Sequence, residues 1–217
     1  MNLAPYIDHT NLRPDASAQD IEKLCQEALS YGFASVCVNS SRVPLAASLL
    51  RGSNTAVCCV AGFPLGAASS AAKAAEAVWA AEHGASEIDM VINIGLLKDG
   101  DDDGVTEDIA SVVRAVPACT VKVIIETCLL SDDEKIRACK AAKAAGAAFV
   151  KTSTGFSSGG AALSDITLMR AAVGPDMRIK ASGGIRDAVF AMELIAASAD
   201  RIGASKSVAM TEEAMRA

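Results

Sequence analysis

Residues 148–182 read AFVKTSTGFSSGGAALSDITLMRAAVGPDMRIKAS, and this stretch contains the unit that decides the fold. The short apolar runs at 148–153 and 178–182 have the length of buried strands, and the segment between them, 164–173, has helical periodicity. Two strands joined through a helix pair in parallel, because parallel strands need a long crossover connection. The stretch therefore predicts a strand, helix, strand unit within a helix-covered parallel sheet.

The same alternation continues along the whole chain, with no linker and no obvious repeat. We expect strands near residues 5–10, 34–39, 55–61, 86–93, 120–127, 148–153, 178–182 and 200–204. We expect helices near residues 16–30, 67–83, 103–116, 131–145, 164–173 and 185–197, with a capping box formed by Ser131 and Glu134. This α/β pattern predicts a single (β/α)8 TIM barrel in which residues 1–217 form one domain. A doubly wound sheet is the alternative.

The composition argues against several classes of function. A net charge of −6 and a pI near 5.0 argue against a nucleic-acid partner, because affinity for phosphate backbones comes largely from lysine and arginine. No segment reaches about 18 apolar residues and no leader pattern is visible, so we expect a cytoplasmic protein without a membrane partner. Seven cysteines without a C-x-x-C pair and only two histidines predict neither disulfides nor a metal site.

Several of the predicted strands carry an ionisable residue inside an apolar run. Because successive strand residues point to opposite faces, Asp89, Lys151 and Lys180 are expected on the inner face of the barrel. The same parity places further side chains there, namely Asp8, Cys37, Lys122 and Glu126. A buried charge is costly unless it is paired or functional, so the set predicts one shared site. A purely structural ion network is the alternative.

Two lysines and one aspartate suit a particular covalent chemistry. Lys151 and Lys180 both stand just before small polar, glycine-rich strand ends, at the rim where barrel active sites form. Without a metal site, a nucleotide fingerprint or a Ser-His pair, we expect no cofactor and a lysine that forms an imine with a carbonyl substrate. A second ammonium nearby favours loss of the proton from such a lysine, and Asp89 can then shuttle protons. Spacing alone does not rank one lysine above the other.

Glycine-rich loops after the last three strands predict a phosphate site. They contain Gly155, the pair Gly183 and Gly184, and the run from Gly203 to Ser205. The last two loops lead into predicted helices, whose free backbone N–H groups favour an anion. We therefore expect a small phosphorylated substrate at this rim.

Seven ordered motifs extend over nearly the whole chain. They are Ile7-Asp8-His9-Thr10, Val36-Cys37-Val38-Asn39, Gly62-Phe63-Pro64-Leu65-Gly66, Glu87-Ile88-Asp89-Met90-Val91, Val121-Lys122-Val123-Ile124-Ile125-Glu126-Thr127, Val150-Lys151-Thr152-Ser153-Thr154-Gly155 and Ile179-Lys180-Ala181-Ser182-Gly183-Gly184-Ile185-Arg186. Together they resemble deoxyribose-phosphate aldolases, class I, metal-independent lyases on a TIM barrel. The resemblance implies reversible cleavage of 2-deoxy-D-ribose 5-phosphate into D-glyceraldehyde 3-phosphate and acetaldehyde in deoxyribonucleotide catabolism. It also implies a homo-oligomer, since such enzymes are often dimers or tetramers.

The resemblance further assigns roles to individual residues. It implies that Lys151 forms the Schiff base, that Asp89 donates and accepts protons, and that Lys180 perturbs Lys151 and joins the proton relay. Residues that match those lining or supporting the pocket are Asp8, Cys37 and Lys122.

Two positions depart from the family pattern in the phosphate clamp. Phe156 stands where the family often has a lysine, and Lys206 stands where a second serine is common. We hypothesise that Lys206, next to Ser205, supplies the missing positive charge together with backbone amides. Two other functions stay open at this point: an imine-forming aldolase or transaldolase with a different aldehyde pair, and a catalytically silent phosphosugar-binding protein.

Overall fold

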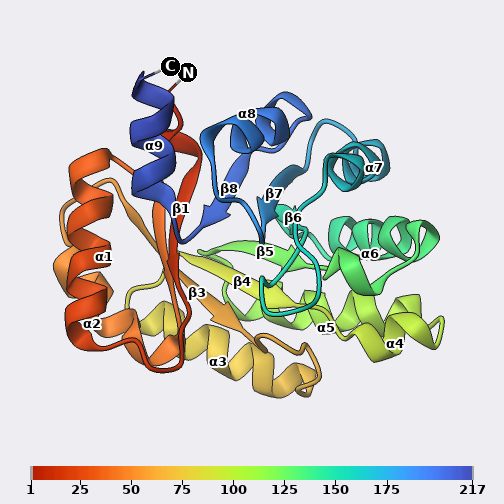
Figure 1. Cartoon of the computed structure of the whole chain (residues 1–217). Helices are drawn as coiled ribbons and strands as arrows, with labels where there is room; N and C mark the ends of the chain where they lie inside the picture. The colour runs from red at the N-terminus through yellow and green to blue at the C-terminus, as the bar shows by residue number, and fades with distance from the viewer. Residues whose placement is uncertain (1, 217) are drawn as a thin grey trace.

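The computed structural model describes residues 2–216 and contains eight parallel strands closed into a barrel (Figure 1). Each strand pairs with the next one along the chain, and the last pairs with the first. The strands are β1 (Ile7–Asn11), β2 (Ser35–Val38), β3 (Ala56–Ala61), β4 (Glu87–Val91), β5 (Thr120–Ile124), β6 (Phe149–Lys151), β7 (Arg178–Ser182) and β8 (Arg201–Ala204). The predicted (β/α)8 TIM barrel is confirmed, and the doubly wound alternative is wrong.

Helices surround the barrel (Figure 1). Among residues 2–216 they are α1 (Ala18–Tyr31), α2 (Val43–Leu49), α3 (Ser70–Glu82), α4 (Ile94–Lys98), α5 (Asp102–Ala115), α6 (Asp132–Ala144), α7 (Leu163–Val173), α8 (Ala188–Ala196) and α9 (Ser207–Arg216), with 3-10 turns at Ala4–Tyr6, Ser40–Arg42 and Thr127–Leu129. The predicted capping box is present: Ser131 Oγ accepts from Glu134 N at 3.3 Å, and the Glu134 carboxylate accepts from Ser131 N at 2.7 Å. The sequence prediction missed α2 and α4, and it expected a helix after the last glycine loop, where α9 lies, without giving its range.

The strands separate an apolar layer from a polar interior. Outward side chains such as Ile88 and Met90 pack against the helices in one buried cluster, which supplies most of the hydrophobic stabilisation. Asp8, Asp89 and Lys122 are fully buried on the other side of the strands. A separate small apolar cluster consists of Leu12, Cys37, Cys58 and Val60, with Phe63 packed against it. The barrel therefore holds its charged residues away from the main apolar core.

Four strands end earlier than the sequence predicts, β2 by one residue and β4, β5 and β6 by two or three. β4 ends at Val91 because Asn93 caps α4, where its side chain accepts a hydrogen bond from Leu96 N at 3.2 Å. β5 ends at Ile124 because Glu126 adopts a left-handed backbone conformation with φ of 55°. Strand parity therefore does not extend to Glu126, and its carboxylate contacts Thr154 instead of the interior lysines.

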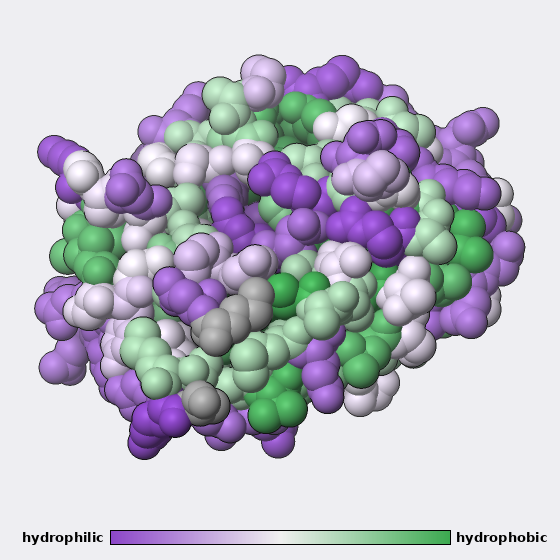
Figure 2. Space-filling view, turned by 90° about the horizontal axis from the view of Figure 1, so that it is seen from above, coloured by the Kyte–Doolittle hydropathy of each residue, from purple (hydrophilic) through white to green (hydrophobic). Residues whose placement is uncertain are grey.

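The surface of the barrel carries both hydrophilic and hydrophobic residues. Hydrophilic and hydrophobic residues are interspersed over the face seen from above (Figure 2). Exposed large apolar side chains come from several different elements, among them Leu65, Trp79, Val189 and Met215. Within residues 2–216, no helix has both the length and the apolar character needed to cross a membrane.

Candidate active site

Three lysines converge on one buried carboxylate inside the barrel. Oδ2 of Asp89 lies 2.7 Å from Nζ of Lys151 and 2.6 Å from Nζ of Lys180. Its Oδ1 lies 2.9 Å from Nζ of Lys122. The strand register explains the meeting, because Asp89 pairs with Lys122 on β5, and Lys151 pairs with Lys180 on β7. The structure therefore brings the charged residues of β4, β5, β6 and β7 to one point.

A second ring of charges lies toward the amino ends of the strands. Asp8 Oδ2 lies 2.6 Å from Nζ of Lys180 and 3.5 Å from Nζ of Lys122. Arg201 contacts Asp8 and lies 3.2 Å from Glu87, whose other oxygen lies 2.5 Å from Nζ of Lys122. Across both rings, four cations face three carboxylates, and each charge has an opposite partner, as burial requires.

The mutual charges keep Asp89 and Lys180 ionised. Burial acts to raise the pKa of Asp89, but the three neighbouring ammonium groups outweigh it and hold the pKa well below its usual range. Burial acts to lower the pKa of Lys180, but Asp8 and Asp89 outweigh it and hold the pKa above its usual range. Lys180 is therefore a lasting ammonium ion at neutral pH.

Lys151 and Lys180, which both contact Oδ2 of Asp89, differ in burial and in the number of carboxylates that they contact. Lys180 is fully buried and contacts two carboxylates, those of Asp8 and Asp89. Lys151 is 3% exposed and lines a pocket, and Asp89 is its carboxylate partner. A nucleophilic amine must reach the substrate and give up a proton, so the structure favours Lys151 over Lys180.

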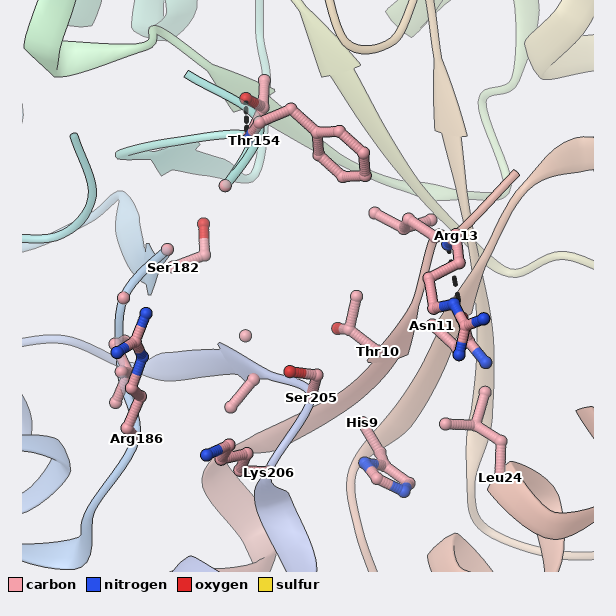
Figure 3. Close-up of a pocket in the computed structure, with 18 of the residues that line it drawn as sticks. His9, Thr10, Asn11, Arg13, Leu24, Thr154, Ser182, Arg186, Ser205 and Lys206 are labelled. Carbon is pink, nitrogen blue, oxygen red and sulfur yellow. Dashed lines mark hydrogen bonds between the residues drawn. The ribbon is translucent and has the colours of Figure 1, made fainter. Parts of the chain in front are cut away.

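Lys151 lies at the inner end of a pocket of about 510 Å³, a size typical of small-molecule sites. The residues predicted to bind phosphate all line it: Gly155, Gly183, Gly184, Ser205 and Lys206. Figure 3 shows Arg186 and Lys206 on one side of this pocket and Arg13 on the opposite side. The pocket is therefore lined both by Lys151 and by two cations on one wall, Arg186 and Lys206, which we call the cationic wall.

The pocket also contains side chains that sequence reasoning did not assign. Arg186, Arg13, Thr154 and Ser182 all line it. Arg186 stands two residues after Gly184 in the sequence Gly183-Gly184-Ile185-Arg186, and a basic residue so close to the glycine pair was the signal that could have identified it. Arg13 is paired with Asp15 at 2.7 Å, so part of its charge is already balanced.

The start of α8 is less suited to an anion than its sequence suggests. Asp187 accepts a hydrogen bond from Phe190 N at 2.8 Å, and Glu213 of α9 accepts one from Ala188 N at 3.0 Å. Two carboxylates thus occupy N–H groups of the first turn, where they oppose a second anion. The expectation that this helix offers free N–H groups to an anion is therefore wrong for Ala188 and Phe190, although the glycine loop before the helix and Arg186 do line the pocket.

The residues predicted to support the pocket, Asp8, Cys37 and Lys122, are fully buried and lie outside the set that lines it. Cys37 on β2 pairs in register with Cys58 on β3. The hydrogen bond with Cys58 lowers the pKa of the Cys37 thiol. Cys58 in turn donates its thiol to Oδ1 of Asp89 at 3.0 Å, so the cysteine that contacts the central carboxylate is one the sequence did not single out.

Cys37, Cys58 and Asp89 place three possible metal ligands within 4.8 Å of one another. Both oxygens of Asp89 already contact ammonium groups, and Nζ of Lys122 lies 3.3 Å from Sγ of Cys58. These positive charges oppose the entry of a further cation. That the site needs no metal stays a prediction.

Comparisons with known proteins agree on one family. Residues 3–210 match the DeoC/LacD family aldolase. This chain belongs to that family. A deoxyribose-phosphate aldolase of Natranaerobius thermophilus is 60% identical over 208 residues, which cover 95% of this chain and 94% of the relative. A relative of the same name from Clostridium kluyveri is 58% identical over 207 residues, which cover 95% of each chain.

A solved structure of the family has the same barrel fold. The deoxyribose phosphate aldolase of Aeropyrum pernix, described as tetrameric, has a TM-score of 0.92 and 33% identity, covering 98% of this chain and 91% of that one. The sequence resemblance is therefore confirmed at the level of the family. The charged cluster and the lining of the pocket all fall within the matched residues 3–210.

Proposed function

We propose that this member of the family is a metal-independent class I aldolase that reversibly cleaves 2-deoxy-D-ribose 5-phosphate into D-glyceraldehyde 3-phosphate and acetaldehyde. The observation that carries the proposal is the amine of Lys151, which reaches the pocket while it contacts Asp89 at 2.7 Å. The names of relatives at 58% and 60% identity support the substrate. One barrel domain supplies every residue of the proposed mechanism.

The proposed reaction begins at Nζ of Lys151. Its neutral amine attacks the C1 aldehyde carbon of the open-chain sugar, and the nitrogen loses a proton as the carbinolamine forms. Protonation of the carbinolamine oxygen and loss of water then give an iminium ion. Lys151 and Lys180 meet at one oxygen atom, Oδ2 of Asp89, so the carboxylate is placed to accept and return these protons and the ammonium of Lys180 to donate one and take it back.

Asp89 gains basicity as the covalent intermediate forms. In the resting site three ammonium groups hold its pKa down, and a neutral carbinolamine at Lys151 removes one of those charges. Asp89 can therefore take up a proton while the carbinolamine is neutral, and the iminium restores the positive charge at Lys151. Removal of the C3 hydroxyl proton from the iminium intermediate then breaks the C2–C3 bond, D-glyceraldehyde 3-phosphate leaves, and the electron pair moves into the iminium to give an enamine. Protonation at C2 and hydrolysis by water release acetaldehyde and restore the amine.

The phosphate is assigned to the cationic wall. Arg186 and Lys206 lie on the same side of the pocket (Figure 3), and a guanidinium can bind phosphate through two parallel hydrogen bonds. Lys206 directly precedes α9, so its charge stands at the amino end of that helix. Phe156 is 55% exposed at the rim and cannot bind phosphate by charge. These two cations are proposed to replace the lysine absent at that position.

We further propose that the enzyme acts in the cytoplasm as a homo-oligomer, a dimer or a tetramer. The tetramer described for the Aeropyrum pernix relative supports association. Size-exclusion chromatography with light scattering measures it directly. A mass of 22.2 kDa, that of one chain, would contradict the proposal.

A cleavage assay tests the proposed reaction. The purified protein should release acetaldehyde and D-glyceraldehyde 3-phosphate from 2-deoxy-D-ribose 5-phosphate, and Lys151→Ala should not. Lys140→Ala, at an exposed lysine of α6, is the matched control and should keep full activity. In the reverse direction acetaldehyde should be accepted as donor, whereas a preference for dihydroxyacetone would indicate a different imine-forming aldolase. Tight binding of the phosphosugar without cleavage would indicate a silent binding protein.

A further inference from the structure

Glu126 combines burial with an unfavourable backbone conformation. Its φ of 55° and ψ of 65° lie in the left-handed region, where Ser198 is the other non-glycine residue of the described chain with positive φ. Long side chains rarely adopt this region, and the strain persists only where the surrounding structure enforces it. The residue is 2% exposed, so its carboxylate also needs partners in the protein.

Thr154 provides those partners. Its backbone N lies 3.2 Å from Oε1 and 3.4 Å from Oε2 of Glu126, and its Oγ1 donates a hydrogen bond to Oε2. The same Oγ1 accepts a hydrogen bond from Phe156 N at 3.1 Å, drawn as the dashed line at Thr154 in Figure 3. A continuous chain of hydrogen bonds therefore runs from Glu126 through Thr154 to the backbone of Phe156.

The backbone beside Glu126 is fastened to the strand that carries Lys151. Ile125 N donates to the carbonyl oxygen of Lys151 at 3.0 Å, and Thr127 N donates to that of Thr152 at 2.9 Å. These two bonds fix Glu126 next to β6. Its side chain then reaches beyond Lys151 to the loop that follows the strand.

That loop forms one wall of the pocket and touches the neighbouring glycine loop. Thr154, Gly155 and Phe156 line the pocket. Ser182 Oγ donates to the carbonyl oxygen of Ser153 at 2.6 Å, and Ala161 N donates to that of Gly183 at 3.0 Å, so the segments that follow β6 and β7 are hydrogen-bonded to each other. A shift of the loop after β6 would therefore displace the loop after β7 as well.

We propose that Glu126 is a positioning residue that sets the geometry of both phosphate-binding loops through Thr154. The inference rests on the proposed function for the identity of the phosphorylated sugar. Its own content is that this carboxylate controls affinity for the phosphate group and leaves imine formation at Lys151 untouched.

Glu126→Gly is the sharpest variant, because glycine adopts left-handed backbone freely and the change removes the carboxylate without adding strain. The KM for 2-deoxy-D-ribose 5-phosphate should rise about 10-fold, the effect of one lost hydrogen bond to a charged group. Cleavage of unphosphorylated deoxyribose and reductive trapping of acetaldehyde should change by less than about twofold. The dissociation constant for inorganic phosphate, measured by calorimetry, should rise with the KM.

Variants of Thr154 test whether Glu126 acts on the loop through its hydrogen bonds to Thr154. Thr154→Val should reproduce the effect, and the double variant with Glu126→Gly should be no worse than either single change, because both break the same connection. Thr154→Ser keeps the hydroxyl and should restore the KM of the wild type. Thr167→Val is the matched control, because the exposed Thr167 donates its hydroxyl to the carbonyl oxygen of Leu163 at 3.1 Å within α7, away from Glu126 and the loop.

Equal rises in KM for the phosphorylated and unphosphorylated sugars, or additive effects in the double variant, would overturn the inference and indicate a purely structural role. If Glu126→Gly fails to fold, the KM values of Glu126→Gln and Thr154→Val for the phosphorylated and unphosphorylated sugars test the inference in the same way. Failure of the wild type to cleave the sugar would overturn the proposed function instead. The phosphate dissociation constants of the variants would then still decide the role of Glu126.

Discussion

Replacing Asp89 by asparagine removes the charge at which three buried ammonium groups meet. Its oxygens lie 2.6 to 2.9 Å from the Nζ atoms of Lys122, Lys151 and Lys180. Removing one partner of a buried ion pair costs about 3–5 kcal/mol. Because Lys180 keeps Asp8 and Lys122 keeps Glu87, Lys151 is the described lysine that loses its carboxylate. We therefore expect Asp89→Asn to lower the free energy of unfolding by about 3–5 kcal/mol, and not by three times that amount.

The pH dependence of this loss follows from the direction of the pKa shift. The pKa of Asp89 in the folded protein lies below its value of about 3.9 in the unfolded chain. Its contribution to stability is thus fully present above about pH 3.9 and is lost as the pH falls through the lower folded value. The difference between wild type and variant should stay constant from about pH 7 to 5 and shrink only below about pH 4.

Urea unfolding followed by circular dichroism measures the difference at each pH. Asp132→Asn is the matched control, because Asp132 pairs with Lys135 at 2.9 Å outside the barrel interior and its side chain is 78% exposed. It should lose about 1 kcal/mol or less. A loss below about 1 kcal/mol in Asp89→Asn, or a difference that closes between about pH 7 and 5, would refute an ionised Asp89 as the centre of the cluster.

Three further predictions concern the pocket. Arg186→Ala should raise the KM for the phosphorylated sugar about 10- to 100-fold by removing charge-assisted hydrogen bonds, and equal effects on unphosphorylated deoxyribose would count against Arg186 as a phosphate ligand. Lys206→Ala should reduce the preference for the phosphorylated sugar about 3- to 10-fold; an unchanged preference would sink the idea that Lys206 replaces the missing cation. Phe156→Lys should lower the KM for the phosphorylated sugar up to about 10-fold at low salt and less at high salt, and no gain at any salt concentration would place the phosphate away from this position.

Strand parity identified most of the charged cluster because the side-chain period of a strand is local and exact. It placed Asp8, Asp89 and Lys122 inside a barrel whose closure was predicted from strand number. The same rule could have found Glu87 and Arg201, which stand two residues before Asp89 and Gly203 on their strands. They were missed because a charge at the first residue of a strand resembles an ordinary strand end.

Other parts of the site depend on contacts that no local pattern encodes. The assignment of the imine to Lys151 and not to Lys180 rests on the exposure of Lys151 and on the second carboxylate at Lys180. At the level of the sequence, only the family resemblance made this assignment. The left-handed turn at Glu126 interrupts an otherwise strand-like run, and its reason is Thr154 on another strand end. The capping of α8 by Glu213 likewise joins segments far apart in the chain.

Reductive trapping tests the central claim most directly. The protein is incubated with acetaldehyde and borohydride, and the modified residue is located by peptide mass spectrometry. The account predicts a single ethylated lysine at Lys151, because this amine alone of the pair on Asp89 Oδ2 reaches the pocket. Modification at Lys180, or an unmodified Lys151, would contradict it.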